Sequence, residues 1–261
     1  RTRMPQVVVL GSGTSNGVPV LGVRYPQEYL DNPKNHRTRA SILIEGPGGN
    51  LLVDCPPELR LQMHREQLFE IDAVLITHTH ADHVMGMDDL RSICLLTRKP
   101  IPIYTLPTYQ EDIRRIYPYA FQEFPPGVHV PRFDLHDVAE EMELCGMRVQ
   151  ILPVPHGNVT TLGLRIGDFA YLTDVSRVPD DTIEKLQGLE TLILDAVRFQ
   201  PHPNHLHYAA AVEVAGRIGA RTTYFTHLSS DYDHDAFEAT MPTELRLAFD
   251  GLRVAIQVET P

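Results

Sequence analysis

The stretch Thr77-His78-Thr79-His80-Ala81-Asp82-His83 places three histidines and an aspartate within six consecutive positions. It directly follows the mostly apolar run Ile71-Asp72-Ala73-Val74-Leu75-Ile76, which is typical of a buried strand. Imidazole and carboxylate groups are preferred ligands of divalent transition metals. The sequence therefore predicts a buried strand that ends in a metal-binding loop.

The spacing within this loop favours two ions rather than one. His78 and His80 alternate at the strand end and can turn toward one ion, whereas Asp82 and His83 can reach a second ion beside it. Two ions about 3.5–4 Å apart can share a bridging water and lower its pKa. A carboxylate usually holds such a pair together, and Asp174, at the end of its own apolar strand, suits that role.

The rest of the chain supplies further candidates at predicted strand ends. His156 follows the strand 147–154, and His227 follows the strand 222–226, so both can complete the metal shells. Other strands are expected at 6–10, at 191–195, at 252–258, and in a hairpin of 40–45 with 50–55. Two β-rich halves that offer loops to one edge would bring these candidates together.

Helices are expected at 58–67, 85–96, 109–117, 179–186 and 207–218. The glycine-rich stretch 11–19 does not open an amphipathic helix, so we interpret it as an active-site loop rather than a dinucleotide-binding turn. The segment 118–131 is rich in proline and aromatic residues. It could be a substrate lid, a dimer contact or a loop held by aromatic packing.

Composition excludes several classes of function. The net charge of −11 and the lack of a Lys/Arg run argue against a broad nucleic-acid surface, although small phosphorylated substrates remain open. Three separated cysteines do not form a disulfide framework, and a reduced cytoplasmic location is expected. No stretch is long and apolar enough for a membrane span, and the first five residues lack a signal-peptide core. We expect Met4 to be the natural start, with residues 1–3 added.

The motif resembles a known family once its later partners are included. The loop at 77–83, the lone His156, Leu172-Thr173-Asp174 and Phe225-Thr226-His227-Leu228-Ser229 together resemble the metallo-β-lactamase superfamily. This resemblance implies a single domain over residues 1–261 with an α/β (α+β) fold. It also implies a four-layer αββα sandwich with a dinuclear site where its two sheets meet.

Two further motifs narrow the resemblance. Leu10-Gly11-Ser12-Gly13-Thr14-Ser15-Asn16-Gly17-Val18-Pro19 and Phe249-Asp250-Gly251 are similar to the branch of the phosphoribosyl cyclic phosphodiesterase of carbon–phosphorus lyase pathways, near tRNase Z. The match implies two sets of ligands joined by a bridging Asp174. One ion is assigned to His78, His80 and His156, and the other to Asp82, His83 and His227.

The same branch has a histidine just before a helix, upstream of the last ligand. His205 matches it and is expected to act as a general acid, because histidine titrates near neutral pH. His207 is the alternative and His202 a weaker one. Asp54 is expected to orient a metal-bound histidine, as Asp195 could also do. Asp233 and His234 are candidates for substrate contact or for a solvated loop.

The chain departs from the branch in two ways. Residues 22–36 contain no cysteine, so the structural zinc site of the phosphodiesterase should be absent. The long arm with which tRNase Z holds tRNA is not evident either. Long nucleic acids are therefore not expected as partners, and a homodimer is expected only from the family.

These observations predict a dinuclear metal-dependent hydrolase, with a phosphodiesterase acting on a small or cyclic phosphodiester as the first choice. A hydroxide bridging the ions would be the nucleophile, with Asp82 and His205 as catalytic residues. The cofactors would be two divalent ions, zinc or manganese, with iron as a further choice. The alternatives are a thioester, lactone or β-lactam hydrolase of the same fold, or a non-catalytic metal-binding protein. The complete set of seven ligand positions argues against the last.

Overall fold

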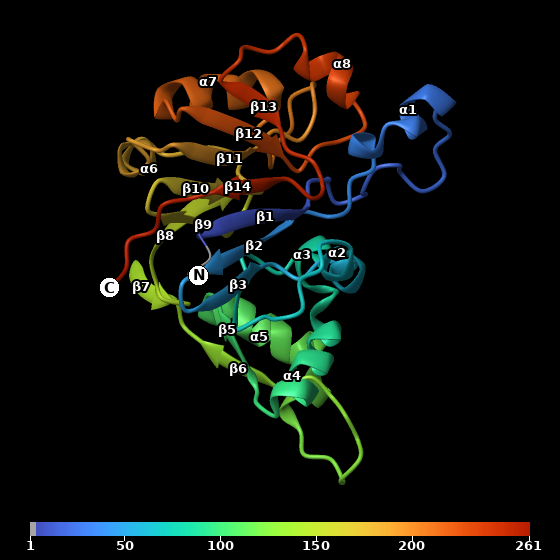
Figure 1. The fold of residues 1–261 in the computed structure, drawn as a ribbon, viewed down its shortest axis with the longest axis vertical. Helices are drawn as coiled ribbons and strands as arrows, with labels where there is room; N and C mark the ends of the chain where they lie inside the picture. Colours follow the sequence, from blue (N-terminus) through green and yellow to red (C-terminus); the bar gives the residue numbers. More distant parts are fainter. Residues whose placement is uncertain (1–3) are drawn as a thin grey trace.

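Two seven-stranded sheets packed face to face form the centre of the molecule, with helices on both outer faces (Figure 1). The structure, a computed structural model, describes residues 4–261. The expected four-layer αββα sandwich is confirmed. The expectation about residues 1–3 lies outside the described residues.

The first sheet takes its strands from the first half of the chain and from the C-terminus. Strands from β14 to β3 are antiparallel neighbours, and those from β3 to β6 are parallel. The expected hairpin is present as β2 and β3. In spatial order the strands are β14 (Arg253–Ala255), β1 (Gln6–Gly11), β2 (Ser41–Gly46), β3 (Gly49–Val53), β4 (Ala73–Leu75), β5 (Ile101–Tyr104) and β6 (Phe133–His136).

The second sheet comes wholly from the second half of the chain. Strands β10 to β13 run parallel, whereas β7, β8 and β9 form an antiparallel meander that continues into β10. The carboxyl ends of β10, β11 and β12 therefore lie at the same edge. In spatial order the strands are β13 (Leu245–Leu247), β12 (Thr222–Thr226), β11 (Thr191–Asp195), β10 (Phe169–Leu172), β9 (Val159–Ile166), β8 (Met147–His156) and β7 (Glu141–Leu144).

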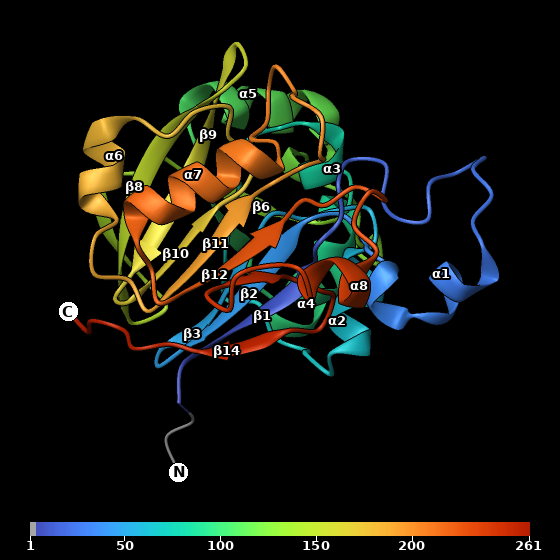
Figure 2. The same ribbon diagram turned by 90° about the horizontal axis from the view of Figure 1, so that it is seen from above.

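Helices cover the outer face of each sheet, and α1 lies on an excursion at one side (Figures 1 and 2). The α-helices are α1 (Gln27–Asp31), α2 (Leu59–Arg65), α3 (Ala81–Val84), α4 (Arg91–Thr97), α5 (Pro107–Ile116), α6 (Asp180–Lys185), α7 (Tyr208–Ile218) and α8 (His234–Glu238). Short 3-10 helices span Pro33–Asn35, Met87–Leu90 and Pro118–Phe121.

One expected helix is wrong in its extent. Residues 85–96 were predicted as a single helix, but a 3-10 turn at Met87–Leu90 precedes α4. Gly86 explains why no single helix starts at residue 85, because its Cα lies against the chain that follows β3. A Cβ there would come within 1.8 Å of the Pro56 carbonyl oxygen. This close contact fixes the path of the chain before α4 can begin.

Strand β1 shows how the layers follow from the sequence. Val7 and Val9 face the second sheet and join the core between the sheets, whereas Val8 and Leu10 join the core beneath the helices. All four side chains are fully buried. A strand buried on both faces is therefore apolar at every position and not only at alternate positions.

The segment 118–131 is partly fixed by aromatic contacts. Phe121 packs on Phe133 with ring centroids 6.0 Å apart, and the Tyr119 hydroxyl donates to Asp88 at 2.5 Å. The remainder extends from the body and lines a cavity with α4, separate from the metal-ligand loop (Figure 1).

The cysteine-free excursion at residues 22–36 is held by polar contacts to the C-terminal region. Asn35 Nδ2 donates to Asp233 Oδ1 at 3.0 Å, and the His234 backbone N–H donates to Asn35 Oδ1 at 2.8 Å. Within residues 4–261, no group of metal-ligating side chains occurs in this excursion. Across the same described range, no helix is long and apolar enough to cross a membrane.

Candidate metal centre

The first sheet brings Asp54 and the 77–83 loop together at its edge. Val53 and Leu75 are partners in the parallel pair β3–β4, so the residues that follow them meet beyond the strands. Asp54 Oδ1 accepts the Thr77 backbone N–H at 2.8 Å, and Asp54 Oδ2 accepts the Thr77 hydroxyl at 2.7 Å. The buried carboxylate therefore fixes the start of the ligand loop.

The second sheet supplies ligands at the ends of neighbouring strands. Asp174 follows β10, Asp195 ends β11 and His227 follows β12, and these three strands are parallel. His156 is the last residue of β8, which lies beyond β9 from β10 in the same sheet. Residues far apart in sequence thus reach one edge because parallel strands end there together.

Three of these strand-end residues have left-handed backbone conformations. The φ angles of Asp54, Asp174 and His227 are 66°, 53° and 59°. Non-glycine residues adopt such angles rarely, and strained residues of this kind cluster at functional sites. Each turn ends its strand abruptly and keeps the side chain at the sheet edge.

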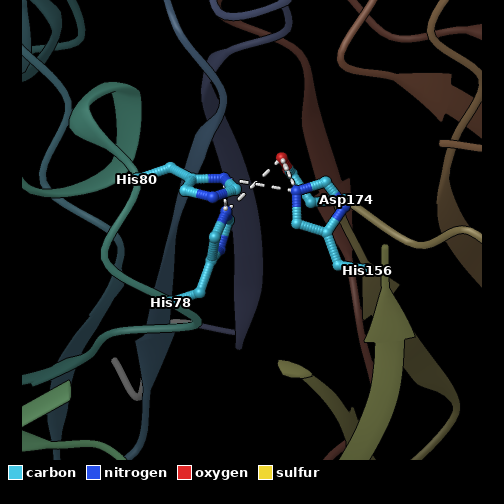
Figure 3. A group of neighbouring side chains, drawn as sticks. All are labelled: His78, His80, His156 and Asp174. Carbon is cyan, nitrogen blue, oxygen red and sulfur yellow. Dashed lines mark hydrogen bonds and ion pairs between the residues drawn. The ribbon is translucent and has the colours of Figure 1, made fainter. Parts of the chain in front are cut away.

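The first ligand group consists of His78, His80, His156 and Asp174, which converge from opposite sides of the site (Figure 3). His80 Nδ1 lies 3.0 Å from His78 Nε2 and 3.3 Å from His156 Nε2. Asp174 Oδ2 lies 3.6 Å from both Nε2 atoms. His80 therefore offers Nδ1 to the shared space, whereas the other two histidines offer Nε2.

The second group consists of Asp82, His83, Asp174 and His227. His83 Nε2 lies 3.1 Å from Asp82 Oδ2 and 3.2 Å from Asp174 Oδ1. His227 Nε2 lies 3.3 Å from both Asp82 Oδ2 and Asp174 Oδ2. Asp174 belongs to both groups, so its carboxylate occupies the position of a bridge.

Hydrogen bonds on the outer nitrogens orient three of the rings. His83 Nδ1 donates to Asp54 Oδ2 at 2.6 Å, and His78 Nδ1 donates to the Thr77 hydroxyl at 3.0 Å. His156 Nδ1 donates to the Asn204 carbonyl at 2.6 Å. Such bonds fix the tautomer, because the opposite nitrogen is then free of its proton and can bind a metal.

The donor atoms fit two divalent ions. Four ligands about 2.1 Å from one ion are about 3.4 Å from one another, close to the 3.0–3.6 Å separations found within both groups. His83 Nε2 is buried and has no hydrogen-bond partner. Ions would satisfy this atom and the others that face it.

The electrostatics also favour cations. Burial opposes the charged form of His227, but Asp174 and Asp82 outweigh it and raise the pKa to about 9. Burial likewise opposes ionisation of Asp174, yet His227 and His83 hold its pKa well below the usual range. Four buried carboxylates, those of Asp54, Asp82, Asp174 and Asp195, therefore surround the histidines and attract positive charge.

His205 lies at the rim of the centre. Its Nδ1 donates to Asp195 Oδ2 at 2.7 Å, and its Nε2 lies 4.0 Å from Asp174 Oδ2. Its ring centroid is 4.7 Å from those of both His156 and His227. The His205 side chain is 11% exposed, so it can contact a bound substrate more readily than the buried ligands can.

Two of the expected substrate residues do not join the cluster. His207 caps the start of α7, and no side-chain hydrogen bond is formed there. His234 is fully buried and accepts a hydrogen bond from Arg37 Nη2 at 2.9 Å on its Nδ1. The weaker candidate His202 lies nearer, with its ring centroid 4.8 Å from that of His205.

Some contributors could not be found in the sequence. Asn204 contributes through its backbone carbonyl, for which no side-chain signal exists. Asp112 on α5 accepts the Thr79 hydroxyl at 2.6 Å and so contacts the residue between two ligands. Nothing in the helical pattern of α5 marks Asp112 as different from other exposed acids.

Comparison with known proteins agrees with this geometry. A family model described as beta-lactamase superfamily domain matches residues 49–228. The chain therefore belongs to the metallo-β-lactamase superfamily, as its motif and four-layer fold indicate.

One solved structure narrows the assignment. A crystal structure of a new diphosphatase from the PhnP family is 34% identical, with a TM-score of 0.91, and the match covers 98% of this chain and 100% of that one. Within the superfamily, the chain is a member of the PhnP family.

Two curated relatives place the chain more broadly. An octanoyltransferase of Porphyromonas gingivalis is 33% identical over 95% of this chain, but the chain spans only about half of that relative, 51%. Ribonuclease Z of Methanopyrus kandleri is 27% identical, over 86% of this chain and 94% of that protein. The expected nearness to tRNase Z is thus confirmed.

Proposed function

We propose that this hydrolase cleaves a small phosphodiester or diphosphate, with His205 as the general acid. One observation carries the proposal. His205 Nε2 faces the same space as the bridging Asp174, at 4.0 Å, while Asp195 holds the opposite nitrogen. A phosphorus centre held by the ligand groups would therefore have a proton donor beside its leaving oxygen.

Two divalent ions, when bound, would polarise the phosphoryl oxygens and make a water molecule more acidic. The chain supplies the remaining functions. Asp54 and Asn204 keep His83 and His156 in the tautomers that bind metal. Asp195 keeps the proton of His205 on Nδ1 and stabilises the ring when Nε2 is protonated, so Nε2 can give its proton to the departing oxygen.

The relatives support a substrate that contains phosphorus. A diphosphatase and a ribonuclease both act on phosphate linkages, and both match most of the chain. The net charge of −11 and the lack of a Lys/Arg run in the sequence disfavour a long polyanion. We therefore infer a small substrate in place of long RNA.

Turnover by metal-replete protein tests the proposal. Protein loaded with Mn²⁺ or Zn²⁺ should hydrolyse bis(p-nitrophenyl) phosphate, a cyclic nucleotide or a dinucleoside diphosphate, and chelation should abolish the activity. Metal analysis beforehand should find about two ions per chain. A fully loaded protein that cleaves nothing in this panel would contradict the proposal.

Paired histidine variants test the general acid. His205→Ala should lose about 100-fold or more in kcat and keep its metal, because a general acid contributes about that factor. His207→Ala is the matched control, since His207 lies at the start of α7 and belongs to none of the three groups of metal-ligating side chains among the described residues. Equal losses of metal and rate in His205→Ala would show that the residue is a ligand.

A second candidate is hydrolysis of an acyl thioester. The relative from Porphyromonas gingivalis, an octanoyltransferase, favours it, although the other half of that protein could carry the named activity. Octanoyl thioesters assayed beside the phosphodiester panel would separate the two. Higher kcat/KM for the thioester would replace the first proposal with this one.

A further inference from the structure

A cavity of about 510 Å³ opens beside the first ligand group, and no step proposed above uses it. Its floor includes the ligand loop at His78, Thr79 and His80. The walls come from α5 and from the start of β9, which follows the ligand His156. Cavities of about 300–1,000 Å³ hold small organic ligands. A group attached to phosphorus at the metal centre can therefore extend into this space.

The charges that line this cavity compensate one another. Arg115 Nη2 donates to Asp112 Oδ1 in a close contact, and Asp112 Oδ2 accepts the Thr79 hydroxyl at 2.6 Å. Among the described lining residues these are the one arginine and the one carboxylate. The Asp112–Arg115 pair therefore adds no net charge to the wall.

The other lining residues are apolar or already satisfied. Ile116 and Val159 present hydrocarbon side chains, and Tyr109 presents its ring while its hydroxyl donates to the Thr160 carbonyl. A subsite for a second phosphate is favoured by an arginine or lysine whose charge is not already offset by a carboxylate. This cavity lacks one, so it fits an uncharged group with an apolar face and some hydroxyls.

We propose that the cavity takes the nucleoside portion of a nucleotide-type substrate, with the base against Ile116 and Val159 and sugar hydroxyls toward the Asp112–Arg115 pair. The inference rests on the proposed phosphorus chemistry and specifies its substrate class. A sugar phosphate with a second terminal phosphate is the competing class, and the compensated charge of that pair disfavours it.

Three chromogenic esters test the proposal in metal-replete protein. Methyl p-nitrophenyl phosphate has no nucleoside, thymidine 5′-(p-nitrophenyl phosphate) adds one, and its 3′-phosphorylated form adds a second phosphate. The nucleoside should raise kcat/KM by about tenfold or more, mainly through KM, because the added contacts bind substrate and transition state alike. The 3′-phosphate should give no further gain.

Variants that fill the cavity supply the second readout. Val159→Trp or Ile116→Trp should reduce the preference for the nucleoside ester toward one, with metal content retained. Val128→Trp is the matched control. Val128 is 49% exposed and lines the separate cavity beside α4, so its substitution should keep the preference.

The outcomes separate the two levels of the proposal. If none of the esters is cleaved, the phosphodiesterase proposal itself fails. Cleavage of all three with equal kcat/KM, or a preference that both tryptophan variants keep, would overturn only the nucleoside subsite. A large gain from the 3′-phosphate that Arg115→Ala removes would show a phosphate subsite instead.

Discussion

His227 at the metal centre and His234 at the start of α8 are both buried, yet the neighbours that dominate their protonation carry opposite charges. Around His227, burial disfavours the proton, but Asp174 and Asp82 overcome it and raise the pKa to about 9. Around His234, burial and the adjacent Arg37 act together and lower the pKa to about 4. The comparison shows that neighbouring carboxylates make a buried histidine a cation ligand, whereas a neighbouring guanidinium makes it a neutral acceptor.

Removing the Asp174 carboxylate, which both ligand groups share, should have the largest effect on the His227 side of this comparison. We expect Asp174→Ala to lose about 1,000-fold or more in kcat/KM, about 4 kcal/mol, because both ligand groups lose a member. Metal content by mass spectrometry and phosphodiester turnover measure the effect. The exposed Asp181→Ala is the control. Full metal content and activity in Asp174→Ala would show that the carboxylate is no bridge.

The next largest effect is expected on the His234 side, and on stability. Arg37 is 1% exposed and donates to Ser12 Oγ at 3.0 Å, to the Ala248 carbonyl and to His234. Arg37→Met should cost about 3 kcal/mol in the free energy of unfolding, because buried acceptors lose their donor. Denaturant unfolding measures it, with Arg246→Met as the exposed control. A change below about 0.5 kcal/mol would contradict this account.

Within the metal centre, the buried carboxylates of Asp54 and Asp195 can be compared, because each holds a different histidine. Asp54 holds the ligand His83, whereas Asp195 holds His205, which lies outside the two ligand groups that share Asp174. Asp54→Asn should weaken metal affinity about 10–100-fold. Asp195→Asn should keep its metal and lose kcat. Chelator competition and turnover distinguish them, and the same loss of metal in both would refute the division.

The smallest effect should appear in the pH dependence of stability. His234 is neutral in the folded state down to pH about 4, whereas the unfolded residue takes a proton near pH 6.5. The unfolded state therefore binds more protons below pH 6.5, and stability falls as the pH drops. His234→Gln should remove about 1 kcal/mol of that loss at about pH 5.5.

Unfolding of metal-free protein at several pH values tests this prediction. Chelator in both samples keeps the metal centre equivalent, so the difference between wild type and variant isolates His234. Parallel curves for the two proteins would show that His234 does not titrate as its surroundings indicate.

The sequence predicted the fold, and it placed four of the seven proposed ligands in one short loop. The 77–83 loop is contiguous, so its chemistry can be read before any folding. Asp174 and His227 were predicted from their places at the ends of apolar strands, which pairing in the second sheet brings to one edge. Only the division of the ligands between two ions depended on the family resemblance. Nothing in the sequence marked their left-handed backbones or the use of Nδ1 by His80.

His234 illustrates why the remainder could not be predicted. It lies soon after the ligand His227, which suggested contact with a substrate. Its partner Arg37 comes from the opposite end of the chain, and only the packed structure shows that the two are buried together. The environment of a histidine depends on such distant contacts, and residue type and spacing do not contain them.

Strand β14 has a consequence for the order in which the protein forms during synthesis. The other strands of the first sheet lie within residues 6–136. Its last strand to be synthesised, Arg253–Ala255, pairs with the outer edge of β1. Until β14 leaves the ribosome, β1 exposes unpaired backbone groups along that edge, and such edges favour pairing with other chains. Strand β14 thus closes the edge of the first sheet, and a nascent chain that has not yet released it would be the form most exposed to aggregation.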